Sequence, residues 1–167
     1  MTSNVWSGML DCTFHGKMHW ELNKEMWFLS KEANTHHQFW KDMGVKITEP
    51  KSPEGYSKVY APKGYDTDLA SIPRAGWALV APWDVARAAI IHDLLYKRIR
   101  QYRWNAEAEV MSGTTLGEDK SLVKAAKKAA DKVFLCGMKD ASPSVPKWKI
   151  YSAYYAVALF GRWSIKP

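Results

Sequence analysis

The sequence predicts an α+β fold, with a small N-terminal antiparallel sheet followed by about three packed helices. Short apolar segments separated by turns containing Pro and Gly fill the first part of the chain, whereas long runs without a breaker fill the last part. At 167 residues, of which 47% are hydrophobic, the chain is large enough for one domain with a substantial core. We therefore expect residues 1–167 to form a single domain.

The strands are expected between Trp27 and Ala61. The apolar segments WFL, VKIT and KVYAP lie there and are separated by polar turns. TEPKSPEG is the best candidate for a hairpin turn, because its two prolines and its glycine interrupt strand pairing and supply turn geometry. We expect these segments to form the small sheet.

Three helices are expected after Ile72. The first covers about Val85 to Arg98, where Asp84 is a good N-cap and the run contains no breaker. It is apolar on most sides, so it should be central. The second covers Ser121 to Met138, and the third lies in KWKIYSAYYAVALFGRW and ends at Gly161.

The positive charge of the chain is concentrated in its last third. The net charge is +7, and from Lys120 onward ten Lys and Arg stand against two Asp, a local net charge of +8. A basic face of this kind meets nucleic acid, anionic lipid or an acidic protein, but lysines spaced along a helix more often form a solvated face. The sequence contains no nucleic-acid-binding motif that favours the first of these partners.

Cysteine content and hydropathy indicate the cellular setting. Cys12 and Cys136 are too few and too distant in sequence for a disulfide framework or a zinc cluster, so we expect both to be reduced. The N-terminus lacks the features of a secretory signal, and no segment reaches the length of a membrane span. We expect synthesis in the host cytoplasm, and a virion protein released by lysis would have the same features.

The segment APKGYDTDLASIPR, from Ala61 to Arg74, is the first candidate for a functional motif. Asp68 lies in a cluster of residues that could act as oxygen ligands or helix caps. Arg74 has a guanidinium group that can bind a carboxylate through two parallel N–H groups. The structural alternative is a turn in which Asp68 or Ser71 caps a short helix while Arg74 pairs with a buried Asp.

The doublet His92-Asp93 is the second candidate, because two ionisable residues stand in the apolar run AAIIHDLLY. Buried ionisable groups need partners. Successive helical residues point about 100° apart, so a metal lying between them would accept both, but a satisfied polar network in the core is the alternative. Asp131 is the third candidate, at the margin of the apolar face of its helix, and an ion pair with Lys127 or Lys128 is the structural alternative.

Together these motifs resemble those of a protein family that occurs in phages and bacteria and is known as domain of unknown function family 1353. VYAPKGYDTDLASIPR, AAIIHDLLY, AADKVFLCGM and YSAYYAVALFG occur in the order of that family. Residues 59–161 form the family-like part, residues 1–58 are a strand-rich part that matches less well, and residues 162–167 are a tail. The resemblance implies a recurring polar set made of Asp68, Arg74, His92, Asp93 and Asp131.

The resemblance implies an origin in phage late or tail-gene regions but no established reaction. The first functional hypothesis is a virion- or tail-associated protein that binds other phage virion proteins through an aromatic and basic surface. The second is a metal-dependent hydrolase of cell-wall, ester or phosphate bonds. In it, Asp68, His92 and Asp131 would hold a divalent metal ion, Asp93 would act as a base or orient a ligand, and Arg74 would stabilise a developing anion. Nucleic-acid binding through Lys124, Lys128 and Lys132 is the third.

Overall fold

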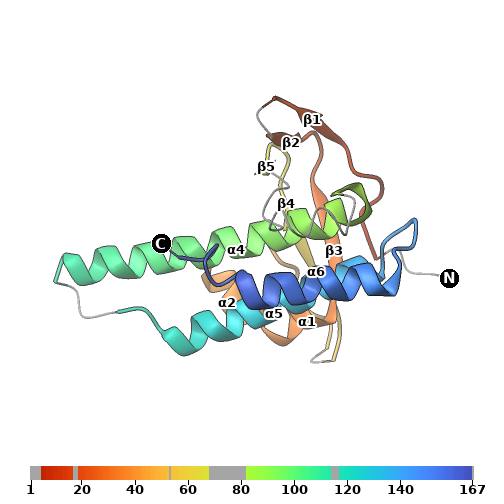
Figure 1. Ribbon diagram of the computed structural model, residues 1–167. Coiled ribbons are helices and arrows are strands. Elements are labelled where there is room, and N and C mark those ends of the chain that lie inside the picture. The colour runs from red at the N-terminus through yellow and green to blue at the C-terminus, as the bar shows by residue number, and fades with distance from the viewer. Residues whose placement is uncertain (1–4, 17–18, 53, 68–81, 114–116, 167) are drawn as a thin grey trace.

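The fold is described here from a computed structural model. It describes residues 5–16, 19–52, 54–67, 82–113 and 117–166, and for residues 82–84 the backbone alone. The described elements are, in chain order, β1 (Cys12–Phe14), β2 (Trp20–Leu22), β3 (Met26–Ser30), α1 (Lys31–Thr35), α2 (His37–Asp42), β4 (Ser57–Ala61), β5 (Asp66–Thr67), α4 (Pro82–Met111), α5 (Lys120–Lys139) and α6 (Lys147–Phe160). The strands precede the three long helices (Figure 1), which confirms the predicted α+β class.

The strands form two small antiparallel sheets. One has the order β1-β2-β5, and the other pairs β3 with β4. In the second sheet Phe28 stands opposite Val59, and burial alternates along both strands. One face of this sheet therefore packs on the core, as the period of two in an antiparallel strand allows.

The predicted turn TEPKSPEG connects two paired segments. Ile47 forms a bridge with Val59, and the Thr48 amide donates to the Lys58 carbonyl at 3.0 Å. The Tyr60 amide donates to the Lys46 carbonyl, also at 3.0 Å. The segment VKIT therefore joins β4 as a short antiparallel partner, although it is an isolated bridge and not a full strand.

Two predictions for the N-terminal half were incomplete. The strands β1 and β2 lie before Trp27, outside the segment in which strands were expected. The short helices α1 and α2 stand between β3 and β4, where strands and loops were expected. Ser30 begins α1, because its hydroxyl accepts from the Ala33 amide at 3.2 Å, and α2 buries Trp40 completely.

Helix α4 is central, as predicted, but it is longer than predicted. Ile90 and Leu95 are both buried. The predicted end at Arg98 was wrong, since the helix continues to Met111. No Gly or Pro follows Arg98 until Gly113, whose φ of 81° is the left-handed conformation that ends helices. The predicted start was also wrong, because the helix begins at Pro82 and Asp84 therefore lies within its first turn and not before it.

Helices α5 and α6 agree closely with the prediction. Helix α5 begins after Asp119, whose carboxylate accepts from the Ser121 and Leu122 amides at 2.9 and 3.1 Å. Helix α6 ends at Gly161, as expected. The C-terminal part of α4 and the N-terminal part of α5 project together from the body of the protein (Figure 1). Among the helices that the structure describes, none is long and apolar enough to cross a membrane.

Candidate functional site

The two residues of the doublet point to different partners. His92 Nε2 lies 3.1 Å from Asp131 Oδ1 of α5, whereas Asp93 Oδ2 accepts a hydrogen bond from the Thr67 hydroxyl of β5 at 2.8 Å. Neighbouring positions on α4 face directions about 100° apart, so one helix supplies a side chain to each of two sites.

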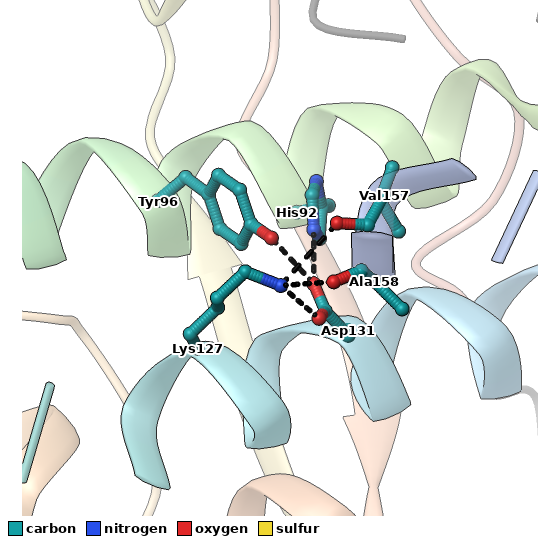
Figure 2. A network of polar contacts seen from close by, with 6 residues as sticks. All are labelled: His92, Tyr96, Lys127, Asp131, Val157 and Ala158. Carbon is teal, nitrogen blue, oxygen red and sulfur yellow. Dashed lines mark hydrogen bonds and ion pairs between the residues drawn. The ribbon is translucent and has the colours of Figure 1, made fainter. Parts of the chain in front are cut away.

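Asp131 lies at the centre of a buried polar network that joins α4, α5 and α6 (Figure 2). Its Oδ1 atom faces His92 Nε2 and accepts from the Tyr96 hydroxyl at 2.6 Å. Its Oδ2 atom accepts from Lys127 Nζ at 2.7 Å. Because a carboxylate offers only acceptors, the facing His92 nitrogen carries the hydrogen. We call His92, Tyr96, Lys127 and Asp131 the Asp131 network.

Lys127 uses all three of its donors. Besides Asp131, its ammonium group contacts the carbonyl oxygens of Val157 and Ala158 at 3.3 and 3.1 Å. These carbonyls belong to the last turn of α6, which carries the negative end of the helix dipole and so favours a cation. Lys127 therefore ties α6 to α5 while it neutralises Asp131 (Figure 2).

The network keeps Asp131 ionised although it is buried. The side chains of Asp131 and His92 are only 5% and 4% exposed. Burial by itself raises the pKa of Asp131, but the hydrogen bonds from His92, Lys127 and Tyr96 outweigh burial, and the pKa lies below its ordinary value of 3.8. Burial, followed by the charge of Asp131, raises the pKa of Tyr96 far above its ordinary value, so its hydroxyl remains a donor.

The described residues of the predicted metal set do not fit a metal ion in this arrangement. His92 donates to Asp131, and the other Asp131 oxygen faces the Lys127 ammonium at 2.7 Å. A cation from the chain itself already occupies the position beside that carboxylate. Within residues 5–67 and 82–166, with the gaps stated above, no group of three or more His, Cys, Asp or Glu side chains is placed to hold a metal.

Two residues of the predicted polar set, Asp68 and Arg74, lie outside the described residues. Their proposed roles as a metal ligand and as an anion-stabilising group therefore stay predictions, as does the complete metal set. In the structural alternative Arg74 was expected to pair with a buried Asp. Lys127 supplies the cation at Asp131, and this is one of the two ion pairs that the sequence offered as the structural alternative for Asp131.

A pocket of about 340 Å³ lies beside Asp93, and Tyr96 of the Asp131 network also lines it. The strand side of the pocket contains Thr67 and Asp66, and the helix side contains Lys97 and Arg100. His19 also lines it, with Nδ1 3.2 Å from Asp66 Oδ2. We call this the Asp93 pocket. It brings together donors, acceptors and both signs of charge from segments far apart in sequence.

Several of these residues were not singled out in the sequence, although some had a signal there. Tyr96 stands one helical turn after His92, so a shared partner could have been expected for the two. Thr67 begins the TDLASIPR motif, beside Asp68 in the cluster of oxygen ligands or helix caps expected there. Nothing in the sequence places His19 near Asp66, because this contact spans 47 positions.

The segments that form these sites lie within a match to a known protein family. Residues 46–157 match the model of a family described as protein of unknown function, DUF1353. The chain belongs to this family. The resemblance seen in the ordered motifs is thereby confirmed, and the DUF1353 part of the chain contains the Asp131 network as well as Thr67 and Asp93. No curated protein and no solved structure matches this DUF1353 chain.

Proposed function

We propose that the chain is an accessory protein of a phage virion or tail that attaches to another virion protein through one exposed face of α6. The observation that carries the proposal is a set of large apolar side chains on α6 and directly after it. All of them are at least 40% exposed. We call this set the α6 face, and its members are Trp148, Tyr151, Tyr155, Leu159, Phe160 and Trp163.

The spacing of the α6 face supports binding to a partner. Positions 148, 151, 155 and 159 follow the helical repeat, so they form one stripe along α6. Stripes with this spacing anchor helices in the apolar grooves of other proteins. Large exposed apolar patches are uncommon on proteins without a partner, and aromatic residues are enriched where partners bind.

Charge supports an acidic partner. The segment from Lys147 to Lys166 contains four basic residues and no acidic residue. Basic groups stand close to the exposed rings, with Lys139 Nζ 5.3 Å from the Tyr151 ring and the Arg162 guanidinium 4.7 Å from the Trp163 ring. A partner with carboxylates around an apolar groove would match both features.

Contacts with the rest of the protein hold α6 and the residues after it in place. Binding of a partner to this helix would therefore cost little conformational entropy. Lys127 binds the carbonyls of Val157 and Ala158, and Arg103 Nη1 donates to the Ile165 carbonyl at 2.7 Å. A preorganised face loses less conformational entropy on binding than a mobile one.

Mass spectrometry of purified particles tests the proposal. The chain is expressed from its own genome, and particles from the same lysate are purified away from free protein. We expect the chain in the particle fraction at a constant ratio to the other virion proteins. Its absence from particles, while it is abundant in the lysate, would refute the proposal.

The metal-dependent hydrolase and the nucleic-acid-binding protein stay predictions. The first requires a divalent ion bound through Asp68, His92 and Asp131, and elemental analysis of protein purified without chelator measures it directly. The second requires salt-dependent DNA binding through Lys124, Lys128 and Lys132. In the structure the last of these already pairs with Glu32 at 3.3 Å.

A further inference from the structure

We propose that the α6 face of one copy of the chain binds a groove at the projecting ends of α4 and α5 of a second copy. This inference rests on the proposed function, because it names an occupant for the same α6 face. A copy that is attached to a particle through its α6 face still presents the groove to the next copy. Pairing of two different surfaces in one direction produces a ring or an open chain of copies.

The groove lies where the C-terminal part of α4 and the N-terminal part of α5 project from the body of the protein (Figure 1). Its volume is about 330 Å³, which lies within the range of small-molecule sites, so a large aromatic side chain fits into it. We call it the tip groove, and its lining residues are Ala106, Glu107, Val110, Met111 and Glu118.

The tip groove presents apolar side chains to a partner. Val110 is 56% exposed and Met111 is 90% exposed. Trp104 stands seven positions before Met111, on the same face of α4, and is 63% exposed. Methionine is flexible and polarisable, so it packs well against aromatic rings and is frequent in binding surfaces. The tip groove therefore offers apolar contacts to the exposed rings of the α6 face.

The charges of the two surfaces are opposite. Residues 104–119 contain four acidic residues and no basic residue, whereas residues 147–166 contain four basic residues and no acidic residue. None of the ion pairs among the described residues involves Glu107 of the groove or Arg162 beside the α6 face. Opposite charge favours pairing of the face with the groove, and like charge disfavours pairing of two faces or two grooves.

Both surfaces are held in place within one copy. Arg103 Nε donates to Glu118 at 3.0 Å, and Arg103 Nη1 donates to the Ile165 carbonyl at 2.7 Å. One side chain thereby fixes a wall of the tip groove and the segment that follows α6. The chain after α6 reaches α4 about one turn before Ala106, where the groove begins. Association of such preorganised surfaces costs little conformational entropy.

Sedimentation velocity of the full chain tests the proposal between about 10 μM and 1 mM. We expect the average mass of the wild type to rise with concentration. Arg162→Glu and Glu107→Arg each place like charges across the contact and should weaken self-association by about tenfold or more. An equimolar mixture of the two variants should recover the wild-type association. In the mixture each substituted surface meets its reversed counterpart, and the native face and groove still match.

Matched variants control for the change in charge. Lys31→Glu and Glu54→Arg make the same changes at exposed positions of the N-terminal half and should leave self-association unchanged. Thermal melting verifies that all four variants fold. The proposal is overturned if the wild type stays monomeric, if both contact variants associate like the wild type, or if their mixture associates no better than either alone. A chain that self-associates but is absent from particles would refute the proposed function alone, whereas a monomeric chain found in particles would refute only this inference.

Discussion

Asp131 shows at the scale of single residues why a buried charge is tolerated in this protein. Both of its oxygens are engaged, by His92 and Tyr96 on one side and by Lys127 on the other. Burying an ion pair costs several kcal/mol per ion, and complete hydrogen bonding offsets that cost. Removing one partner should therefore be much more damaging than the number of lost contacts suggests.

Two adjacent lysines of α5 provide a matched test. Lys127→Met leaves Asp131 without its cation and should lower the free energy of unfolding by about 3–5 kcal/mol. Lys128→Met makes the same chemical change at an exposed position and should alter stability by less than about 0.5 kcal/mol. Urea denaturation measures both variants. Equal effects would contradict a structural role for the Asp131 network.

The lowered pKa of Asp131 makes part of the stability depend on pH. The contribution of Asp131 is fully present above its ordinary pKa of 3.8, where the side chain is ionised in both the folded and the unfolded state. It is lost as the pH falls through the lower pKa of the folded state, because the unfolded chain binds the proton first. The stability difference between wild type and Asp131→Asn should therefore shrink below pH 3.8. A difference that stays constant down to acid-induced unfolding would be inconsistent with an ionised Asp131.

At this scale the sequence revealed candidates but not their partners. His92, Asp93 and Asp131 stand out because ionisable residues are rare in apolar helical runs. The split of the doublet between Asp131 and Thr67 depends on where α5 and β5 pack against α4, and no local pattern encodes that. Lys127 could be paired with Asp131 from its spacing, but its burial between α5 and α6 could not be predicted.

At the scale of elements, the contact between α4 and the end of α6 explains the glycine at position 161. The φ of Gly161 is −62°, so an unusual backbone conformation is not the reason for a glycine here. A Cβ atom at this position would overlap the Tyr96 hydroxyl and the Val157 carbonyl oxygen. The glycine therefore lets the chain after α6 approach the Asp131 network.

Substitution of this glycine tests the contact. Gly161→Ala should destabilise the protein by about 1–3 kcal/mol, because Tyr96 must move away from Asp131 or α6 must shift. Gly117→Ala is the control, since among the described residues the nearest atom to a Cβ at that position would be Val110 Cγ2 at an ordinary 3.7 Å. Thermal unfolding compares the two variants. A Gly161→Ala protein as stable as the control would show that α6 is not packed this closely.

The elements themselves were predictable in proportion to their length. The three long helices could be predicted because breaker-free runs with caps such as Gly161 mark them locally. The strands β1 and β2 have only three residues each, which is too short for a recognisable periodic pattern. Their prediction would have required knowledge of their pairing partners. The continuation of α4 past Arg98 was missed because the apolar pattern thins there, although no residue in that stretch ends a helix.

At the scale of the whole molecule, the interior and the surface carry different roles. The Asp131 network ties the three long helices together. The Asp93 pocket borders this network through Tyr96, and Ser164, which follows Trp163 of the α6 face, also lines the pocket. The positive charge of the last third accompanies the α6 face, and basic groups around an apolar interface mainly raise association rate and selectivity. The proposed attachment through this face should therefore depend on its aromatic side chains for its affinity.

Particle occupancy of one matched pair of variants tests the central claim, attachment through α6, most directly. Tyr155 of the α6 face and Tyr56 before β4 are the same residue type and are 58% and 57% exposed. Quantitative mass spectrometry of purified particles compares Tyr155→Ala, Tyr56→Ala and the wild type. We predict that Tyr155→Ala lowers the copy number per particle by about tenfold, as loss of an aromatic interface residue does, and that Tyr56→Ala has no effect. Equal copy numbers per particle for the wild type and both variants would contradict attachment through α6.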